Sequence, residues 1–560
     1  MVYQPAPRYA LVHGAVDRGF APLASEIERS RPASLAIDGP AGLDWEVLTA
    51  GLLAELARRG IAARAIDVRL RLRDWAEIER MTERPALRGD AVFAAAADID
   101  LAALFADPPA APPGGADLTI AYGPASALTP HTLLWYADVP KRVAQRRAER
   151  GGVPNLGQPR GAAGSLRRLM FVDWPLQDRH RRTLVRRWTR YIDASDAERP
   201  RSVVAGSLWP TLAALASAPF RTRPSFLAQP WGGRWVGDVL GVREGEPNGG
   251  LGYELVAPES GILLGGDEPV EVPLDLLVAD APDAVLGAAV VNRFGASLPI
   301  RFDYLDTAGG GDLSVHCHPR GGYMREVFAL PYTQHESYYV MVTRPGARIF
   351  LGLREDADLD AFRAEAARSR DDPRPLDVER FVGTFPALQH QLYLIPAGTP
   401  HGSGEGNVVL EISATPYLYS LRFYDWLRAG LDGDPRPVQL AHAFANLDTA
   451  RRGQAVADEL VPRPAPLRRG DGFVEHVLGR HPDLFFEVHR IDCEREVGES
   501  TAGRFHVLNL VEGDEITVRT AAGREHVLSY AETLFVPAAA GDYTLDPAGG
   551  RAKIVKAFVA

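Results

Sequence analysis

The residues with the clearest chemical pattern are two histidines, His316 and His318, separated by one position. Side chains alternate across a β-strand, so both imidazoles are expected on one face of a strand. Glu336 follows about one hairpin later, and His401 ends a later strand-and-loop segment. Three nitrogens and one carboxylate oxygen suit a divalent metal such as zinc, with room left for water or substrate oxygens. The spacing therefore predicts one metal site.

The bulk composition indicates an ordinary folded protein of more than one domain. The chain has 560 residues, 46% of them hydrophobic and 24% charged, which favours two to four domains over extensive disorder. The net charge is −10, from 62 basic and 72 acidic residues. Without a long basic run, this charge argues against nucleic acid or an anionic membrane as a partner.

The cysteine content and hydropathy predict a cytoplasmic location. Two cysteines, Cys317 and Cys493, cannot build a disulfide scaffold, and a reducing compartment fits them better. No apolar run approaches the roughly 20 residues of a membrane span, and the first residues lack a basic region followed by an apolar core. We expect a small molecule as the partner, and the oligomeric state stays open.

Lysine is almost absent from the middle of the chain. The only lysines are Lys141, Lys553 and Lys556, so an anion site between them has to use arginine. Arg320 and Arg325, shortly after the histidine pair, are candidates for gripping a phosphate because the guanidinium group binds oxyanions with two hydrogen bonds.

The predicted elements divide the chain into three domains. Residues 1–205 alternate between strands, such as 34–38 and 62–68, and helices, such as 45–59, which is typical of an α/β domain with a parallel sheet. Residues 215–465 show short β-type runs, including 288–292 and 338–342. Helical segments are expected at 359–368 and 378–385 and across much of 419–460. Residues 466–560 are rich in strands and glycine, like a small antiparallel barrel or sandwich.

Several motifs in the middle of the chain resemble the class I phosphomannose isomerases. They are Leu298-Pro299, Leu305-Asp306, the segment 313–319 with the histidine pair, the segment 395–401 that ends at His401, Leu410-Glu411-Ile412, and Arg422-Phe423-Tyr424-Asp425-Trp426. The resemblance covers roughly residues 220–560. It implies a cupin fold, so the expected architecture is an α/β domain followed by two cupin (β-barrel or jelly-roll) domains, with a helical insertion.

The same resemblance implies a zinc-dependent aldose–ketose isomerase. His316, His318, Glu336 and His401 become the metal ligands, and Arg422 becomes the active-site arginine. The family most often has glutamine at the position of His316, and histidine is a competent ligand there. The family usually has a lysine two residues before the ligand glutamate, where this chain has Gln334, and another lysine aligns with Asp303.

The N-terminal segment resembles a P-loop nucleoside kinase whose phosphate loop has degenerated. A strand, a glycine-containing turn with Gly39 and Gly42, and a helix follow one another as a P-loop requires. The lysine position is Trp45 and the hydroxyl position is Glu46, so the side chains that hold phosphate and magnesium are missing. We therefore expect no ATP binding.

An aldose–ketose isomerisation moves a proton between neighbouring carbons through an enediol. It needs stabilisation of an oxyanion and one group that removes and returns the proton. Arg422 is the candidate for the first task besides the metal. Glu411 is a candidate base, and His335, next to the substituted lysine position Gln334, is another.

Three functions remain open on the sequence. The first is interconversion of mannose 6-phosphate and fructose 6-phosphate. The second is isomerisation of another free or phosphorylated aldose, which Gln334 and Asp303 motivate. The third is a cupin that binds a metal and a sugar in a regulatory role, without turnover, which the fused N-terminal segment makes conceivable.

Overall fold

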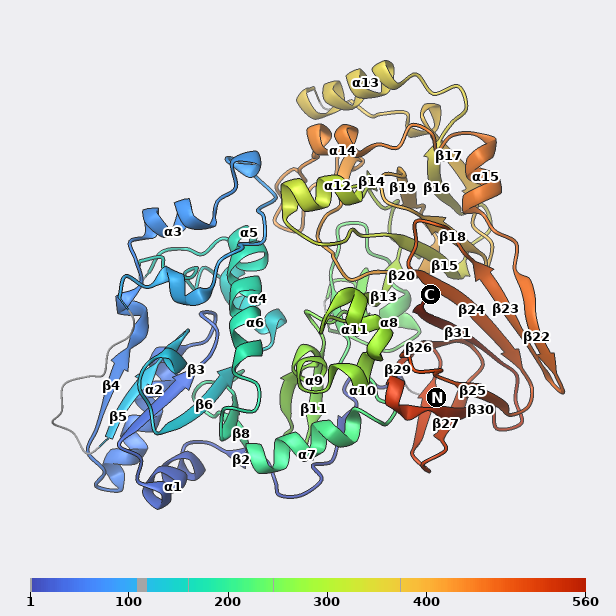
Figure 1. The fold of residues 1–560 in the computed structure, drawn as a ribbon. Helices are drawn as coiled ribbons and strands as arrows, with labels where there is room; N and C mark the ends of the chain where they lie inside the picture. The colour runs from blue at the N-terminus through green and yellow to red at the C-terminus, as the bar shows by residue number, and fades with distance from the viewer. Residues whose placement is uncertain (1–2, 108–117, 160, 245, 373) are drawn as a thin grey trace.

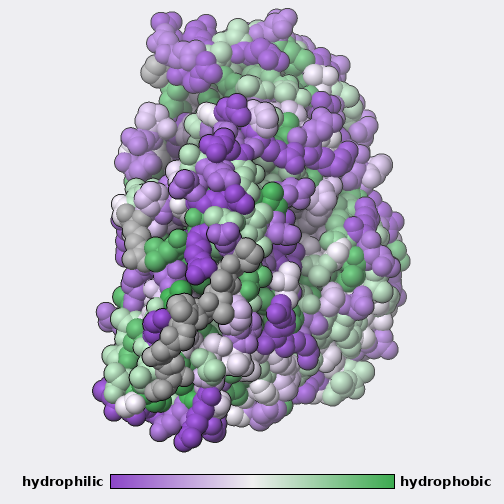
Figure 2. Space-filling view, turned by 60° about the vertical axis from the view of Figure 1, so that its left-hand side comes forward, coloured by the Kyte–Doolittle hydropathy of each residue, from purple (hydrophilic) through white to green (hydrophobic). Residues whose placement is uncertain are grey.

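The architecture comes from a computed structural model, which describes residues 3–107, 118–159, 161–244, 246–372 and 374–560. Figure 1 shows an α/β layer structure at the N-terminal end of the chain and a larger assembly of β-sheets formed by the rest. Polar and apolar side chains are interspersed on the face shown in Figure 2. Within the described ranges, every helix is too short or too polar to cross a bilayer.

The N-terminal α/β part, residues 17–215, is built on a seven-stranded sheet with the order β2-β8-β7-β6-β3-β5-β4. Its parallel strands are β3 (Ser34–Asp38), β4 (Ala63–Asp67), β5 (Leu118–Tyr122), β6 (Leu133–Asp138) and β7 (Arg190–Asp193). The antiparallel strands are β2 (Asp17–Arg18) and β8 (Arg201–Val204). The helices are α1 (Ala21–Ser30), α2 (Trp45–Arg58), α3 (Trp75–Thr82), α4 (Lys141–Glu149), α5 (Leu166–Arg168), α6 (Trp174–Thr183) and α7 (Ala205–Leu215). The parallel sheet that the alternating pattern predicted is present.

The turn between β3 and α2 differs chemically from a phosphate-binding loop. Trp45 is fully buried, and its indole donates a hydrogen bond to the Pro40 carbonyl at 3.0 Å. Glu46 forms an ion pair with Arg69 at 2.7 Å. A P-loop places a lysine and a hydroxyl at these two positions, so the turn keeps the geometry of a strand–turn–helix unit without those side chains.

The first β part, residues 225–460, consists of two facing sheets. One has the order β18-β15-β20-β13-β10-β9 and the other β17-β16-β19-β14-β21. The strands are β9 (Ser225–Leu227), β10 (Leu251–Leu255), β13 (Ile300–Asp306), β14 (Val315–Cys317), β15 (Glu336–Thr343), β16 (Arg348–Leu353), β17 (Val382–Pro386), β18 (Leu392–Ile395), β19 (His401–Ser403), β20 (Asn407–Ala414) and β21 (Leu421–Tyr424). The helices among them are α8 (Trp235–Asp238), α9 (Leu274–Asp280), α10 (Pro282–Leu286), α11 (Ala288–Phe294), α12 (Gly321–Tyr323), α13 (Leu359–Asp371), α14 (Leu440–Asn446) and α15 (Gln454–Leu460).

The second β part, residues 465–559, repeats the two-sheet plan with the orders β22-β23-β24-β31-β26-β29 and β25-β30-β27-β28. Its strands are β22 (Ala465–Gly470), β23 (Phe473–Gly479), β24 (Phe486–Cys493), β25 (Val497–Ser500), β26 (His506–Glu512), β27 (Glu515–Thr520), β28 (Glu525–Ser529), β29 (Thr533–Val536), β30 (Asp542–Asp546) and β31 (Ala552–Val559). Tyr304 of β13 donates a hydrogen bond to the Ala531 carbonyl at 2.7 Å and accepts one from Asn509. This buried contact joins the two β parts.

The start of the chain also lies against the first β part. Strand β1 (Arg8–Tyr9) pairs in parallel with β11 (Gly261–Leu264), which pairs with β12 (Val270–Pro273). The chain then crosses to the N-terminal α/β part and returns through residues 216–224. Two segments far apart in sequence therefore hold the two parts together.

Two local predictions were wrong and a third was right only in part. Residues 288–292, predicted as a strand from their valines, form most of α11, in which Val290 is buried and Val291 and Phe294 pack against the core. Packing of one helical face outweighs the β-propensity of valine here. The predicted helix 378–385 is one 3₁₀ turn (Val378–Arg380) followed by β17. The piece 419–460 begins with strand β21 before its helices.

Candidate metal centre

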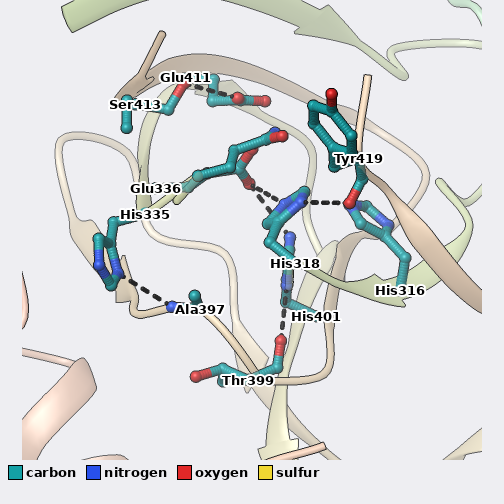
Figure 3. A network of polar contacts seen from close by, with 12 residues as sticks. His316, His318, His335, Glu336, Ala397, Thr399, His401, Glu411, Ser413 and Tyr419 are labelled. Carbon is teal, nitrogen blue, oxygen red and sulfur yellow. Dashed lines mark hydrogen bonds and ion pairs between the residues drawn. The ribbon is translucent and has the colours of Figure 1, made fainter. Parts of the chain in front are cut away.

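The four predicted ligands come together in the first β part. His316 lies in β14, His318 just after it, Glu336 opens β15 and His401 opens β19. All four are buried, and one ligand atom from each lies within 4.8 Å of the others. Figure 3 shows the three imidazoles and the Glu336 carboxylate converging from different strands. The pairing of His316 with His401 across β14 and β19 brings the two distant sequence motifs together.

Backbone carbonyls orient each imidazole in the same way. The Nδ1 atom of His316 lies 2.9 Å from the Ser314 oxygen, that of His318 3.2 Å from the Tyr419 oxygen, and that of His401 2.8 Å from the Thr399 oxygen. A carbonyl only accepts, so each Nδ1 carries the hydrogen and each Nε2 presents a lone pair. Metal-binding histidines are held by this arrangement, because it fixes the tautomer and the ring orientation.

The electrostatics of His316, His318 and Glu336 favour the forms that bind metal. Burial and the neighbouring imidazoles hold the pKa of His316 well below its usual value, and burial also lowers the pKa of His318. Burial alone raises the pKa of Glu336, but its interactions with His318 and His401 bring it well below the usual range. Neutral imidazoles beside an ionised carboxylate are the ligand forms that a divalent metal needs.

One buried ligand atom is left without a hydrogen bond. His318 Nε2 lies 3.0 Å from Glu336 Oε2, yet the geometry between them is not that of a hydrogen bond. A buried polar nitrogen without a partner is costly, and a metal ion among the four residues would satisfy it. The donor set of three nitrogens and one oxygen fits zinc.

Sequence reasoning missed Arg301, which provides the positive charge beside the metal ligands. Its guanidinium group is buried and forms ion pairs with Asp303, Glu411 and, at 3.1 Å, Glu336. The sequence analysis considered Asp303, where the resembling family has a lysine, and did not consider Arg301. The two residues are two positions apart and therefore share one face of β13. Arg301 therefore places one fixed positive charge next to Glu336, Glu411 and Asp303.

Glu411 and Gln334 lie next to the ligand carboxylate. Gln334 Nε2 donates a hydrogen bond to Glu336 Oε1 at 2.5 Å. The Ser413 hydroxyl donates to Glu411 Oε1 at 2.9 Å. Burial, with the nearby Glu336 and Asp303, raises the pKa of Glu411 well above that of an ordinary glutamate, although Arg301 opposes the shift. Strongly shifted carboxyls of this kind cluster at functional sites, which makes Glu411 a candidate for proton transfer.

These residues border one cavity of about 230 Å³. Its polar lining consists of Gln229, Tyr253, Arg301, Ser314, His316, Gln334, Glu336, Tyr338, Glu411, Tyr417, Ser420, Arg422 and Arg436. The apolar lining consists of Val92, Phe93, Trp231, Leu251, Leu305, Leu313 and Leu418. A hollow of this kind, mixed in polarity and next to a metal-ligand cluster, suits a small polar ligand.

Arg422 and Arg436 bring excess positive charge to that cavity. Asp425 lies 3.8 Å from Arg422, 2.5 Å from Arg436 and 3.5 Å from Arg428, so three guanidinium groups share one carboxylate. Burial, with Arg436 nearby, lowers the pKa of Arg422 to about 10, which leaves it charged at neutral pH. Its buried Nε has no hydrogen-bond partner. This cluster can bind an anion.

Three predicted substrate residues lie outside the cavity. His335 points away from Glu336, and its Nδ1 accepts a hydrogen bond from the Ala397 amide at 3.1 Å (Figure 3). Arg320 directly precedes α12, and its amide donates a hydrogen bond to Asn446 Oδ1 at the end of α14. The side chains of Arg320 and Arg325 are exposed. Alternation along β15 explains why Gln334 and Glu336 share a face that His335 does not.

Comparisons with known proteins match a family model to the first part of the chain and show a fold for the rest. Residues 19–217 match the family model "Domain of unknown function (DUF8485)". No curated protein matches the sequence. The family match names no P-loop kinase, so that relationship stays a prediction.

Solved structures similar to this chain include three phosphomannose isomerases. The mannose 6-phosphate isomerase from Bacillus subtilis is 19% identical, with a TM-score of 0.50, over 61% of this chain and 99% of that one. A candidate mannosephosphate isomerase from Archaeoglobus fulgidus is 20% identical (TM-score 0.47, 61% and 98% covered). A variant of phosphomannose isomerase from Salmonella typhimurium is 17% identical (0.46, 61% and 99%). At this identity the first likeness shows the fold alone: most of the chain has the cupin fold of a phosphomannose isomerase.

Replacing a ligand should remove the metal, whereas replacing the neighbouring histidine should not. We expect His318→Ala to lower zinc affinity by more than about 100-fold, since even residues that only support ligands contribute 10- to 100-fold. His335→Ala is the matched control, because that ring lies on the other side of β15 and should leave the affinity unchanged. Zinc per chain after equilibrium dialysis against a competing chelator measures both. Equal retention by the two variants would contradict the assigned ligand set.

Proposed function

We propose that this protein is a metal-dependent aldose–ketose isomerase that interconverts mannose 6-phosphate and fructose 6-phosphate. One observation carries the proposal: two of the four clustered candidate ligands (His316 and Glu336), a buried carboxyl (Glu411) and two arginines (Arg301 and Arg422) border the same small cavity. Isomerisation needs these three kinds of group together, namely a Lewis acid, a proton carrier and a cation for the developing oxyanion. The shared fold with a mannose 6-phosphate isomerase supports it.

A phosphorylated substrate is favoured by the arginines around Asp425. Arg422, Arg428 and Arg436 exceed the negative charge of that one carboxylate, and Arg422 and Arg436 line the cavity. A phosphate dianion would balance this excess and accept hydrogen bonds from the guanidinium groups. Arg422 and Arg436 thus bind the phosphate in place of the lysine that the class I phosphomannose isomerases use. Arg320 and Arg325 do not contact the phosphate.

Each residue at the cavity has a separate task in the proposed reaction. A bound divalent metal supplies Lewis-acid stabilisation of negative charge on the sugar oxygens. Glu411 takes the proton from C2 of the aldose and returns it to C1, so the same carboxyl serves as base and acid. The proton of the C2 hydroxyl passes to the C1 oxygen, so that C2 becomes the carbonyl carbon of the ketose. Arg301 lies against Glu411 and keeps a fixed positive charge beside the developing enediolate. Gln334 holds Glu336 through its amide and keeps the carboxylate directed to the ligand cluster.

The direct test is a coupled assay of the zinc-loaded protein on mannose 6-phosphate and on free mannose, with metal content measured on the same sample. We expect turnover of the phosphorylated sugar and incorporation of solvent deuterium at C1 or C2 of the recovered sugar. No turnover and no exchange, with about one metal per chain, would reject this isomerase. Turnover of a different aldose would keep the chemistry and change the substrate.

Removing the proposed proton carrier should abolish turnover without loss of metal. General acid–base catalysis contributes about 10²- to 10⁴-fold, so Glu411→Gln should lower kcat by at least about 100-fold while zinc content stays at the wild-type level. The control is Glu405→Gln, the same change at an exposed position six residues earlier. If Glu411→Gln keeps more than a tenth of the wild-type kcat, the carboxyl is not the proton carrier.

The phosphate assignment gives a separate expectation for Arg436. Losing a charged hydrogen bond costs about 1.5–3 kcal/mol, so Arg436→Met should raise KM for mannose 6-phosphate by about 10- to 100-fold. The inhibition constant Ki of inorganic phosphate as a competitive inhibitor should rise by a similar factor. Arg320→Met, at an exposed arginine outside the cavity, is the control. Equal KM values in the two variants would exclude Arg436 from phosphate binding.

A further inference from the structure

Part of the metal cavity is bordered by a segment from outside the cupin fold. Val92 and Phe93 belong to the N-terminal α/β part, yet they line the cavity together with His316, Glu336 and Arg422. More than 200 residues of sequence separate them from the nearest of those three. In Figure 1 the connection after α3 reaches across toward α12 and α14 of the first β part.

Asp90 fixes this segment against the first β part. Its Oδ1 accepts hydrogen bonds from the Val92 amide at 2.8 Å and the Phe93 amide at 2.7 Å, which shapes a tight turn. Its Oδ2 lies 2.8 Å from His442 Nε2 on α14, and His442 Nδ1 lies 2.5 Å from the Tyr323 hydroxyl. One carboxylate therefore shapes the turn and ties it to the first β part.

Phe93 anchors the turn in an aromatic cluster. Its ring is 1% exposed and lies 5.3 Å from the Phe328 ring and 6.1 Å from the rings of Phe171 and Tyr419. The Phe93 carbonyl accepts a hydrogen bond from Arg167 Nε at 2.7 Å. Tyr419 is also the residue whose carbonyl orients His318. The anchor thus packs directly against the support of a metal ligand.

Val92 and Phe93 both border the cavity. Phe93 is buried in the aromatic cluster, whereas Val92 is half-buried. We propose that Val92 is a specificity-determining residue: the N-terminal α/β part provides an apolar wall of the substrate cavity and limits it to a single sugar unit. This inference rests on the proposed isomerase function. The cavity of about 230 Å³ lies below the range of roughly 300–1,000 Å³ typical of sites for larger ligands.

The wall can be moved in both directions by substitution. Val92→Phe narrows the cavity, and we expect KM for mannose 6-phosphate to rise about tenfold or more, since small volume changes in a specificity pocket alter discrimination by 10- to 200-fold. Val92→Ala widens it, and we expect KM to change little while a phosphorylated disaccharide becomes a competitive inhibitor. Val12→Phe and Val12→Ala are matched controls, because Val12 lies in the same N-terminal region and is 55% exposed.

A second readout separates this proposal from the isomerase assignment. The rate at which dipicolinate removes zinc from the loaded full-length protein reports access to the cavity, with or without turnover. We expect Val92→Phe to slow zinc removal and Val92→Ala to speed it by about threefold or more, an effect of altered access that the Val12 variants should lack. If the assay on mannose 6-phosphate fails while these rates change, only the isomerase assignment falls. If all four variants match the wild type in zinc removal, Val92 is not a wall of the cavity.

Discussion

The site depends on one buried cation, Arg301. Its guanidinium group lies among Asp303, Glu336 and Glu411, none of which has appreciable contact with water. Three carboxylates this close in a medium of low dielectric would repel one another and take up protons. Arg301 keeps them together, and breaking such a buried network by removing one partner costs about 3–5 kcal/mol. The ligand carboxylate and the proposed proton carrier are held in place by the same charge.

Strand register determines which residues meet Arg301. In the sheet order β15-β20-β13, Glu336 pairs with Ser413, which pairs with Arg301. Two residues along each strand, Tyr338, Glu411 and Asp303 form the next row. A step of two residues keeps all six side chains on one face. A register slip of one residue in β20 would turn Glu411 and Ser413 to the opposite face of the sheet. Because both faces are packed, the register that buries the core also fixes the position of Glu411.

Local patterns in the sequence predicted that His316, His318, Glu336 and His401 come together, as they do, because the histidine pair and the His401 segment are recognisable within a few residues. The same reasoning failed where tertiary packing decides the outcome. Residues 288–292 look like a strand but form a helix that packs through Val290, Val291 and Phe294. Arg320 and Arg325 were chosen for their closeness in sequence to the histidine pair, and strand geometry carries them outside the cavity. Val92 had no local signal, since only the contact of Asp90 with His442 brings it there.

Arginine in place of lysine separates two tasks that one residue can combine. A lysine near a sugar substrate can supply charge and, once its pKa is lowered, can also exchange a proton. Arginine stays protonated in proteins, so Arg301 and Arg422 can stabilise an oxyanion but cannot serve as bases. In the proposed reaction, a chain without lysine between Lys141 and Lys553 needs another group for proton transfer, and Glu411 borders the cavity. Burial and its acidic neighbours raise the pKa of Glu411 well above that of an ordinary glutamate. Without lysine at this site, the positive charges come from arginines that do not exchange protons, and the proposed proton carrier is a carboxyl whose pKa is raised.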